Sequence, residues 1–105
     1  ITPEVVETLL ETMVENSRQA GADTVTIRIE PADTGVVLWV TDDGPGIAIA
    51  DLERIFEPFF TGRREAGGAG LGLAIARSLL AATGGTIVAK EVPAGACFRL
   101  RLPVA

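Results

Sequence analysis

The chain has 105 residues, of which 48% are hydrophobic and 22% charged, a balance typical of one globular domain and unlike that of a disordered segment. Its net charge of −5 argues against nucleic acid as a partner, because phosphate backbones attract basic proteins. There is no histidine and one cysteine, so histidine catalysis, phosphohistidine formation and a disulfide within this chain are excluded. The sequence shows neither a signal peptide nor an apolar run of transmembrane length, so we expect a cytoplasmic domain without direct membrane contact.

In chain order, the first predicted element is a helix over Pro3–Ala20, where apolar residues recur at helical spacing. A half-buried strand is predicted over 24–30, because Val and Ile alternate there with polar residues. Residues 31–35 have turn composition, and a nearly continuous apolar strand follows over 36–41. The two strands are expected to pair as a hairpin.

The second half begins with a short helix predicted from Asp51, as its cap, to Phe56, with Pro58 ending it. A glycine-rich stretch leads to a helix over 71–83 that is apolar on most sides and therefore expected to be largely buried. Residues 86–91 and 96–103 read as a second hairpin. This order predicts an α+β fold with helices on one face of a sheet.

Two glycine-rich loops are the strongest functional signal: 42–47, which follows a strand, and 67–73, which runs into a helix start. Glycine lets a ligand approach backbone amides, and a helix start favours phosphate. The second loop lacks the spacing of a P-loop or a dinucleotide fingerprint. Each loop alone also fits an ordinary turn or linker. Together they predict a clamp on an anionic ligand, with a nucleotide as the favoured candidate.

Asn16 is a polar residue on the apolar face of the first helix. A buried amide needs a partner, and its oxygen is a ligand that Mg²⁺ accepts. The alternative is an Asn at the solvent edge near the helix end. In the aromatic run Phe56, Phe59 and Phe60, at least one side chain is expected in the core. The others could anchor a lid in which Arg63 reaches phosphate.

Four segments in order resemble the motifs of the catalytic, ATP-binding domain of sensor histidine kinases, in the GHKL superfamily of ATPases. They are an N box at 13–17, a first glycine box at 42–47, an F box at 56–60 and a second glycine box at 68–73. The resemblance covers nearly the whole chain. It implies a Bergerat fold, a two-layer sandwich of a mixed β-sheet faced by helices. Members of the family carry strand structure before the N-box helix, so residues 1–105 are expected to lack an N-terminal portion of that domain.

The resemblance implies ATP and Mg²⁺ as ligands. Asn16 would coordinate Mg²⁺ between the phosphates, and Asp42 would accept a hydrogen bond from the adenine amino group. Residues 61–69 would form the lid over the nucleotide. The further ATP contacts would be made by Gly44, Gly46, Ile47, Phe59, Thr61, Arg63, Gly68, Gly70, Leu71 and Gly72. None of these is assigned a catalytic role.

The implied reaction moves the γ-phosphoryl group to a histidine on a separate dimerisation domain of the same parent protein. A receiver domain of a response regulator would act downstream, and the parent could be membrane-anchored. Two positions depart from the family pattern: Thr12 replaces a second Asn, and Gln19 replaces a basic residue.

Hydrolysing relatives place a general-base Glu at the position of Thr12, which argues against a GHKL ATPase. A serine kinase of the anti-sigma type, and a module that has lost ATP, stay open as alternatives.

Overall fold

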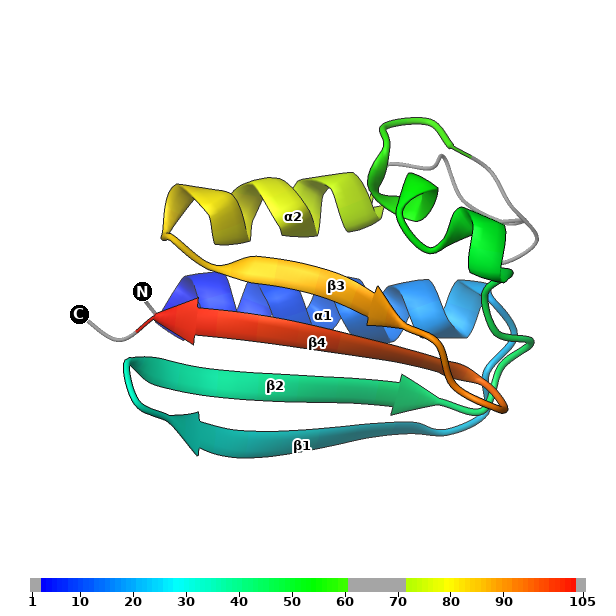
Figure 1. The fold of residues 1–105 in the computed structure, drawn as a ribbon, viewed down its shortest axis with the longest axis horizontal. Coiled ribbons are helices and arrows are strands. Elements are labelled where there is room, and N and C mark those ends of the chain that lie inside the picture. The colour runs from blue at the N-terminus through cyan, green and yellow to red at the C-terminus, as the bar shows by residue number, and fades with distance from the viewer. Residues whose placement is uncertain (1–2, 61–71, 104–105) are drawn as a thin grey trace.

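The computed structural model describes residues 3–60 and 72–103, which form two layers (Figure 1). Helices α1 (Pro3–Gln19) and α2 (Gly72–Ala82) lie on one face of a four-stranded sheet. Two short 3₁₀ turns, η1 (Ile49–Asp51) and η2 (Arg54–Phe56), come after the first two strands and before α2 in the sequence. The strands are β1 (Val25–Ala32), β2 (Gly35–Asp42), β3 (Thr86–Lys90) and β4 (Ala96–Pro103).

The strand order across the sheet is β1-β2-β4-β3, and each of the three pairings is antiparallel. Hairpins join β1 to β2 and β3 to β4, and a tight turn between neighbouring strands imposes antiparallel pairing. The predicted two-layer α+β architecture is therefore confirmed. The described strands pair only antiparallel, so the parallel neighbour that a mixed sheet requires is not among them.

The core lies between the helices and the two central strands. Side chains alternate across a strand, so every second residue of β2 and β4 faces the helices. These residues meet one stripe from each helix, which makes one continuous apolar cluster. Its most deeply buried members are Leu9, Met13, Val40, Leu73, Ala76, Leu80, Phe98 and Leu100.

The predicted helix over Pro3–Ala20 and both hairpins are confirmed to within two residues. The turn predicted to start at Pro31 is wrong, since β1 continues to Ala32 and Pro31 pairs with Val36. Among the described strands β1 has a neighbour on one side only, and an edge strand tolerates a residue without an N–H.

The helix predicted over 51–56 is also wrong. Two 3₁₀ turns stand there, and Asp51 ends the first of them instead of capping a helix. The second helix is less buried than its composition predicts: α2 buries one stripe, while Ile75 is 51% exposed. None of the helices in the described ranges is long and apolar enough to cross a membrane.

The helix layer is narrower than the sheet. Ile27 and Ile29 pair with Val40 and Leu38, so they lie on the helix-facing side of β1. Both are nevertheless exposed, and Ile29 keeps 65% of its accessible surface. The helices thus cover β2, β4 and β3, and on the inner face of β1 they meet Val25 but leave Ile27 and Ile29 open. The prediction that this strand is half-buried is therefore wrong, since every residue of β1 after Val25 is exposed.

We expect Leu100→Ala to lower the free energy of unfolding by about 2–5 kcal/mol, because it opens a cavity in the centre of the core. Ile29→Ala is the matched control. It removes an apolar side chain from the same face of the sheet, where little area is buried, and should cost less than about 1 kcal/mol. Urea denaturation of both variants measures the difference, and equal costs would contradict the uncovered position of β1.

Candidate functional site

The end of β2 is tied to α1 by a carboxylate. Ser17 on α1 is fully buried, and its Oγ donates a hydrogen bond of 2.6 Å to Oδ2 of Asp42. The backbone N–H of Gly44 donates to Oδ1 of the same carboxylate at 3.0 Å. One side chain thus links the C-terminal part of α1 to the first glycine loop.

Asn16 precedes Ser17 and is 7% exposed, so the alternative of a solvent-edge Asn is wrong. Its position follows from the periodicity of α1, which buries Leu9, Met13 and Asn16 along one stripe. The structure therefore brings Asn16 and Asp42, which are 26 residues apart in sequence, to the same end of the sheet through the neighbouring Ser17.

The two consecutive carboxylates at the end of β2, Asp42 and Asp43, have different hydrogen-bond partners. Asp43 accepts hydrogen bonds from the backbone N–H groups of Asp23 and Thr24 at 2.8 and 2.9 Å. These two donors stabilise the charged form of the Asp43 carboxyl and therefore hold its pKa below the usual range. The hydrogen bond from Thr24 has the larger effect and that from Asp23 the next. Asp43 thus fastens the loop between α1 and β1, which leaves Asp42 as the carboxylate of the glycine loop.

Asp42 is half-buried at the start of the glycine loop, and both of its carboxylate oxygens accept hydrogen bonds, Oδ2 from Ser17 and Oδ1 from Gly44. An ionised carboxylate is an acceptor for N–H and O–H donors. This arrangement fits recognition of an exocyclic amine such as that of adenine.

Two glycines hold the first loop against the turn between β3 and β4. Gly46 has φ +85°, and a Cβ there would lie 2.8 Å from the carbonyl oxygen of Gly95. Gly95 has φ +69°, and a Cβ on it would lie 1.9 Å from the carbonyl oxygen of Asp42. Both positions therefore require glycine, for conformation and for space. Ile47, the last predicted contact of this loop, is half-buried and packs against the core.

The start of α2 lies beside α1. A Cβ on Gly72, the first residue of α2, would lie 3.7 Å from Cγ2 of Thr12, one turn before Asn16. The hydroxyl of Thr12 donates to the carbonyl oxygen of Thr8 at 2.8 Å, so its proton is engaged within the helix. The one described glycine of the second loop is thus next to the helix that carries Asn16.

The aromatic run divides into three environments. Phe56 belongs to the core, as expected for at least one of the three, and Phe60 packs against it. Phe59 has φ +64°, unusual for a residue with a side chain, and is 71% exposed. Five predicted contacts lie outside the described residues: Thr61, Arg63, Gly68, Gly70 and Leu71.

Two residues that contact Asp42, namely Ser17 and Gly95, were not among the predicted site residues. Ser17 lies in the N-box segment, and its hydroxyl on the buried stripe of the helix could have indicated a buried hydrogen bond. Gly95 belongs to a turn far along the chain, and no sequence pattern connects it with Asp42.

The described residues contain no group of three or more Asp, Glu or Cys side chains suited to a metal ion. A metal held here by the protein would therefore need further oxygen ligands from elsewhere. Mg²⁺ fits this requirement, because it takes few protein groups and completes its coordination with phosphates and water. The amide oxygen of Asn16 is a donor of the required kind.

Gly95→Ala should destabilise the protein by more than about 2 kcal/mol, because it combines a positive φ with a direct clash against Asp42. The matched control is Gly21→Ala, at φ +94° with nothing within 4 Å of the added Cβ. It should cost only the conformational part, about 1–2 kcal/mol. Thermal and urea unfolding of both variants test this, and equal losses would show that Gly95 does not support the loop.

The chain is similar over residues 2–105 to the model of the family described as histidine kinase-, DNA gyrase B-, and HSP90-like ATPase. The C4-dicarboxylate transport sensor protein DctB of Rhizobium meliloti is 37% identical over 101 residues, which are 92% of this chain and 16% of DctB. The chain thus spans less than a fifth of this curated relative.

Two solved structures share the fold. The mycobacterial sensor histidine kinase MprB superimposes with a TM-score of 0.83 at 27% identity, over 98% of this chain and 72% of that one. Full-length ShkA in complex with AMPPNP gives 0.77 at 34% identity, over 96% of this chain and 22% of that one. The chain therefore belongs to the histidine kinase-, DNA gyrase B- and HSP90-like ATPase family, as a catalytic domain of the sensor histidine kinase type.

Proposed function

We propose that this domain holds ATP·Mg²⁺ with the adenine at Asp42 and the phosphates toward α1 and the start of α2. The single observation that carries the proposal is the placement of the Asp42 carboxylate, which Ser17 of α1 and the backbone N–H of Gly44 hold at the start of the glycine loop. ShkA, a structural relative, was solved with the ATP analogue AMPPNP. Among the predicted base contacts, Gly44, Gly46 and Ile47 would border the adenine.

Asn16 would hold Mg²⁺ from α1, and Gly72 with the residues before it would bring amides to the phosphates. The proximity of Gly72 to Thr12 supports this placement, because it puts the start of α2 one turn from Asn16. When bound, Mg²⁺ would offset the negative charge of the phosphates, which this acidic chain could not do by its overall charge.

The reaction that we propose is phosphoryl transfer to a histidine supplied by another domain of the parent protein. A nitrogen of that imidazole attacks the γ-phosphorus, an N–P bond forms, the bond from the γ-phosphorus to the β,γ-bridging oxygen breaks, and ADP leaves. The imidazole proton passes to solvent or to a base of the partner domain. The exposed side chains of Phe59 and Ile75 are candidate contacts for that domain. A receiver domain would then take the phosphoryl group in the cytoplasm, where ATP is available.

Hydrolysis is disfavoured by the surroundings of Asn16. Thr12 cannot act as a general base for water, and its hydroxyl is bonded to Thr8. Glu15 is exposed and paired with Arg18, which lowers the pKa of the carboxyl and keeps it on the outer face of α1. We therefore expect transfer to dominate over turnover by the domain alone.

The open inner face of β1 supports a further part of the proposal, that residues 1–105 lack an N-terminal portion of the domain. Ile27 and Ile29 are apolar, lie on the helix-facing side and are exposed. Additional chain in the parent protein would cover them.

Asp42→Ala should weaken binding of AMPPNP by about 10- to 100-fold, as expected for the loss of a charge-assisted hydrogen bond. Asp43→Ala is the matched control, because it removes the adjacent carboxylate whose partners are backbone groups of the neighbouring loop. It should reduce stability and leave the affinity for AMPPNP within about twofold. Isothermal titration measures the affinity of both variants, and unchanged affinity in Asp42→Ala would place the base elsewhere.

Asn16→Ala should weaken AMPPNP binding when Mg²⁺ is present and change it little in EDTA. A wild-type affinity that is the same with and without Mg²⁺ would refute this metal assignment.

Mixing the protein with [γ-³²P]ATP and a dimerisation domain that carries the acceptor histidine should yield an acid-labile, base-stable phosphoprotein on the dimerisation domain. Phosphohistidine has this stability, whereas phosphoserine survives acid. The matched control replaces the acceptor histidine by Gln and should remain unlabelled. An acid-stable product would favour the serine kinase alternative, and rapid ADP release without any acceptor would favour an ATPase.

A further inference from the structure

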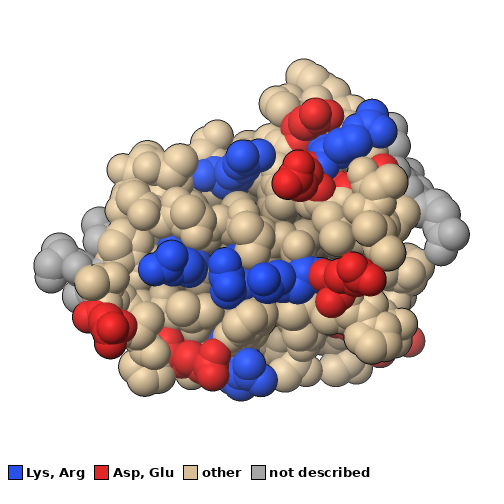
Figure 2. All heavy atoms as spheres, viewed as in Figure 1, with Lys and Arg blue, Asp and Glu red and all other residues tan. Residues whose placement is uncertain are grey.

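The side of the sheet that faces away from the helices carries a concentration of positive charge. The register places Lys90, Arg99 and Arg101 on this open face, because their neighbours in β3 and β4 point into the core. Figure 2 shows Lys and Arg side chains in a row across the middle of this face. The chain as a whole has a net charge of −5, so this row is a local reversal of sign.

A groove of about 610 Å³ opens beside this row, along β3. Four consecutive residues of β3, Ile87 to Lys90, line it. Since side chains alternate between the two faces of a strand, a groove that touches four in succession lies at the edge of the strand. In the described sheet β3 is paired only with β4, so this edge presents backbone N–H and C=O groups without a ladder partner.

The walls of the groove are amphipathic. On the helix side, Phe56 and Ile87 form the apolar floor of the groove, each with 6% of its surface exposed, and the Arg77 guanidinium lies 5.7 Å from the centroid of the Phe56 ring. On the open-face side lie Lys90 and Arg99. The complete lining includes four cations and two carboxylates, so the groove is net positive: Arg54, Arg77, Lys90, Arg99, Glu53 and Glu57.

Arg99 provides an independent sign of a missing partner. Its Nε atom is buried and has no hydrogen-bond partner among the described residues. A buried donor without a partner costs free energy, and a carboxylate delivered to this wall would supply the acceptor. Arg99 is also the register partner of Val88, so such a carboxylate would arrive beside the middle of the β3 edge.

From these observations we infer that the groove binds an extended, acidic segment of a partner protein, which adds to β3 as a fifth strand. Main-chain hydrogen bonds to the free edge supply affinity, and alternate side chains supply specificity. Apolar residues of the segment face Phe56 and Ile87, and the acidic residues between them face Arg99 and Lys90. The five residues of β3 span about 17 Å, which matches a peptide of about five residues.

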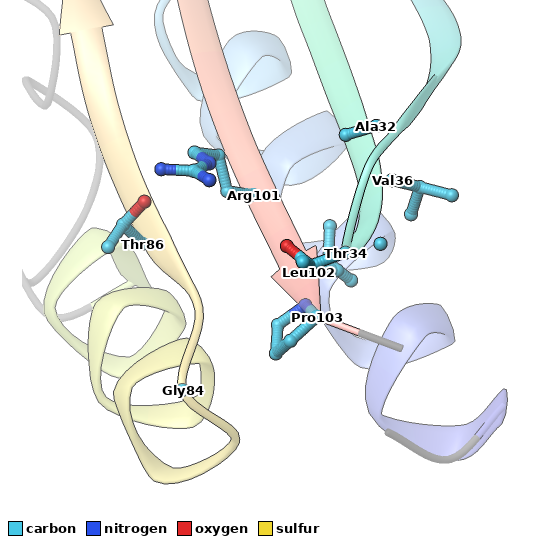
Figure 3. A pocket seen from close by; sticks show the side chains of 9 residues that line it. Ala32, Thr34, Val36, Gly84, Thr86, Arg101, Leu102 and Pro103 are labelled. Carbon is cyan, nitrogen blue, oxygen red and sulfur yellow. The ribbon is translucent and has the colours of Figure 1, made fainter. Parts of the chain in front are cut away.

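This groove is separate from the proposed nucleotide site, since none of its lining residues is a predicted ATP contact. A smaller hollow of about 120 Å³ lies at the opposite end of the sheet, near the turn between β1 and β2 (Figure 3). Arg101 is the one charged residue that lines it. Arg101 shares the strand and the face of Arg99 but does not line the groove, and it therefore offers a matched control.

The probe is a fluorescein-labelled peptide, Val-Glu-Val-Glu-Val, titrated into the protein at physiological salt and followed by anisotropy and by ¹⁵N NMR shifts. The peptide should bind and shift amides of β3 and of Arg99. Val-Val-Glu-Glu-Val, which has the same composition without alternation, should bind at least about tenfold more weakly, and so should a peptide methylated on alternate amides. Equal binding of either control would overturn strand addition.

Arg99→Glu and Arg77→Glu should each weaken the alternating peptide at least about tenfold, because both residues line the groove. Arg101→Glu should stay within about threefold, because Arg101 does not line the groove. Arg99→Gln removes the guanidinium and its charge without introducing a negative charge, and it guards against misfolding of the Glu variant. Unchanged affinity in Arg99→Gln, or displacement of the peptide by inorganic phosphate at equal concentration, would refute a peptide groove. Shifts confined to the glycine loop would do the same. AMPPNP binding should be unaffected by Arg99→Gln, so failure of this inference is distinguishable from failure of the proposed function.

Discussion

The half-buried carboxylate of Asp42 is the constraint on which the rest of this corner depends. A charge that is partly removed from water needs hydrogen bonds, and Asp42 accepts them from different elements, among them Ser17 on α1 and Gly44 in the loop after β2. Gly95, in the turn before β4, approaches the carbonyl of the same residue more closely than any side chain would permit. Helix, strand end and hairpin turn therefore meet at one residue, and a ligand that binds Asp42 meets a site whose geometry is set before binding.

The unequal widths of the two layers explain much of the surface. Two helices cover about the width of three strands, so the core lies under β2, β4 and β3, and the inner face of β1 stays open. On the opposite face no helix covers the described sheet (Figure 1). There the cations Lys90, Arg99 and Arg101 lie beside apolar residues such as Val88 and Trp39. Four acidic residues lie along α1, whereas Lys90, Arg99 and Arg101 share the open face of β3 and β4. The proposed nucleotide site would lie at the end of the sheet, and the proposed peptide groove along its edge.

The sequence pattern predicted the bounds of a helix or strand well where those bounds depend on residues within the same segment. The helical repeat of α1 and the alternation of β4 predicted their extents, because burial of one stripe or one face is a property of the segment. The predictions failed where neighbours in space decide. Pro31 extends a strand because β1 lies at the edge of the described sheet, and Ile75 is exposed because α2 meets the sheet along one stripe only. Composition alone cannot show how many sides of an apolar helix find a partner.

The sequence by itself determined the order of the four motifs and hence the family, since these segments are short, local and specific in their spacing. It also placed Asn16 on the buried stripe of its helix. Tertiary structure alone decided which of two adjacent carboxylates faces the loop, why Gly95 is required, and that four consecutive residues of β3 line an edge with cations from α2 and β4. Each of these depends on contacts between residues more than 10 positions apart. Such contacts form only when the helices pack on the sheet, and no local pattern encodes them.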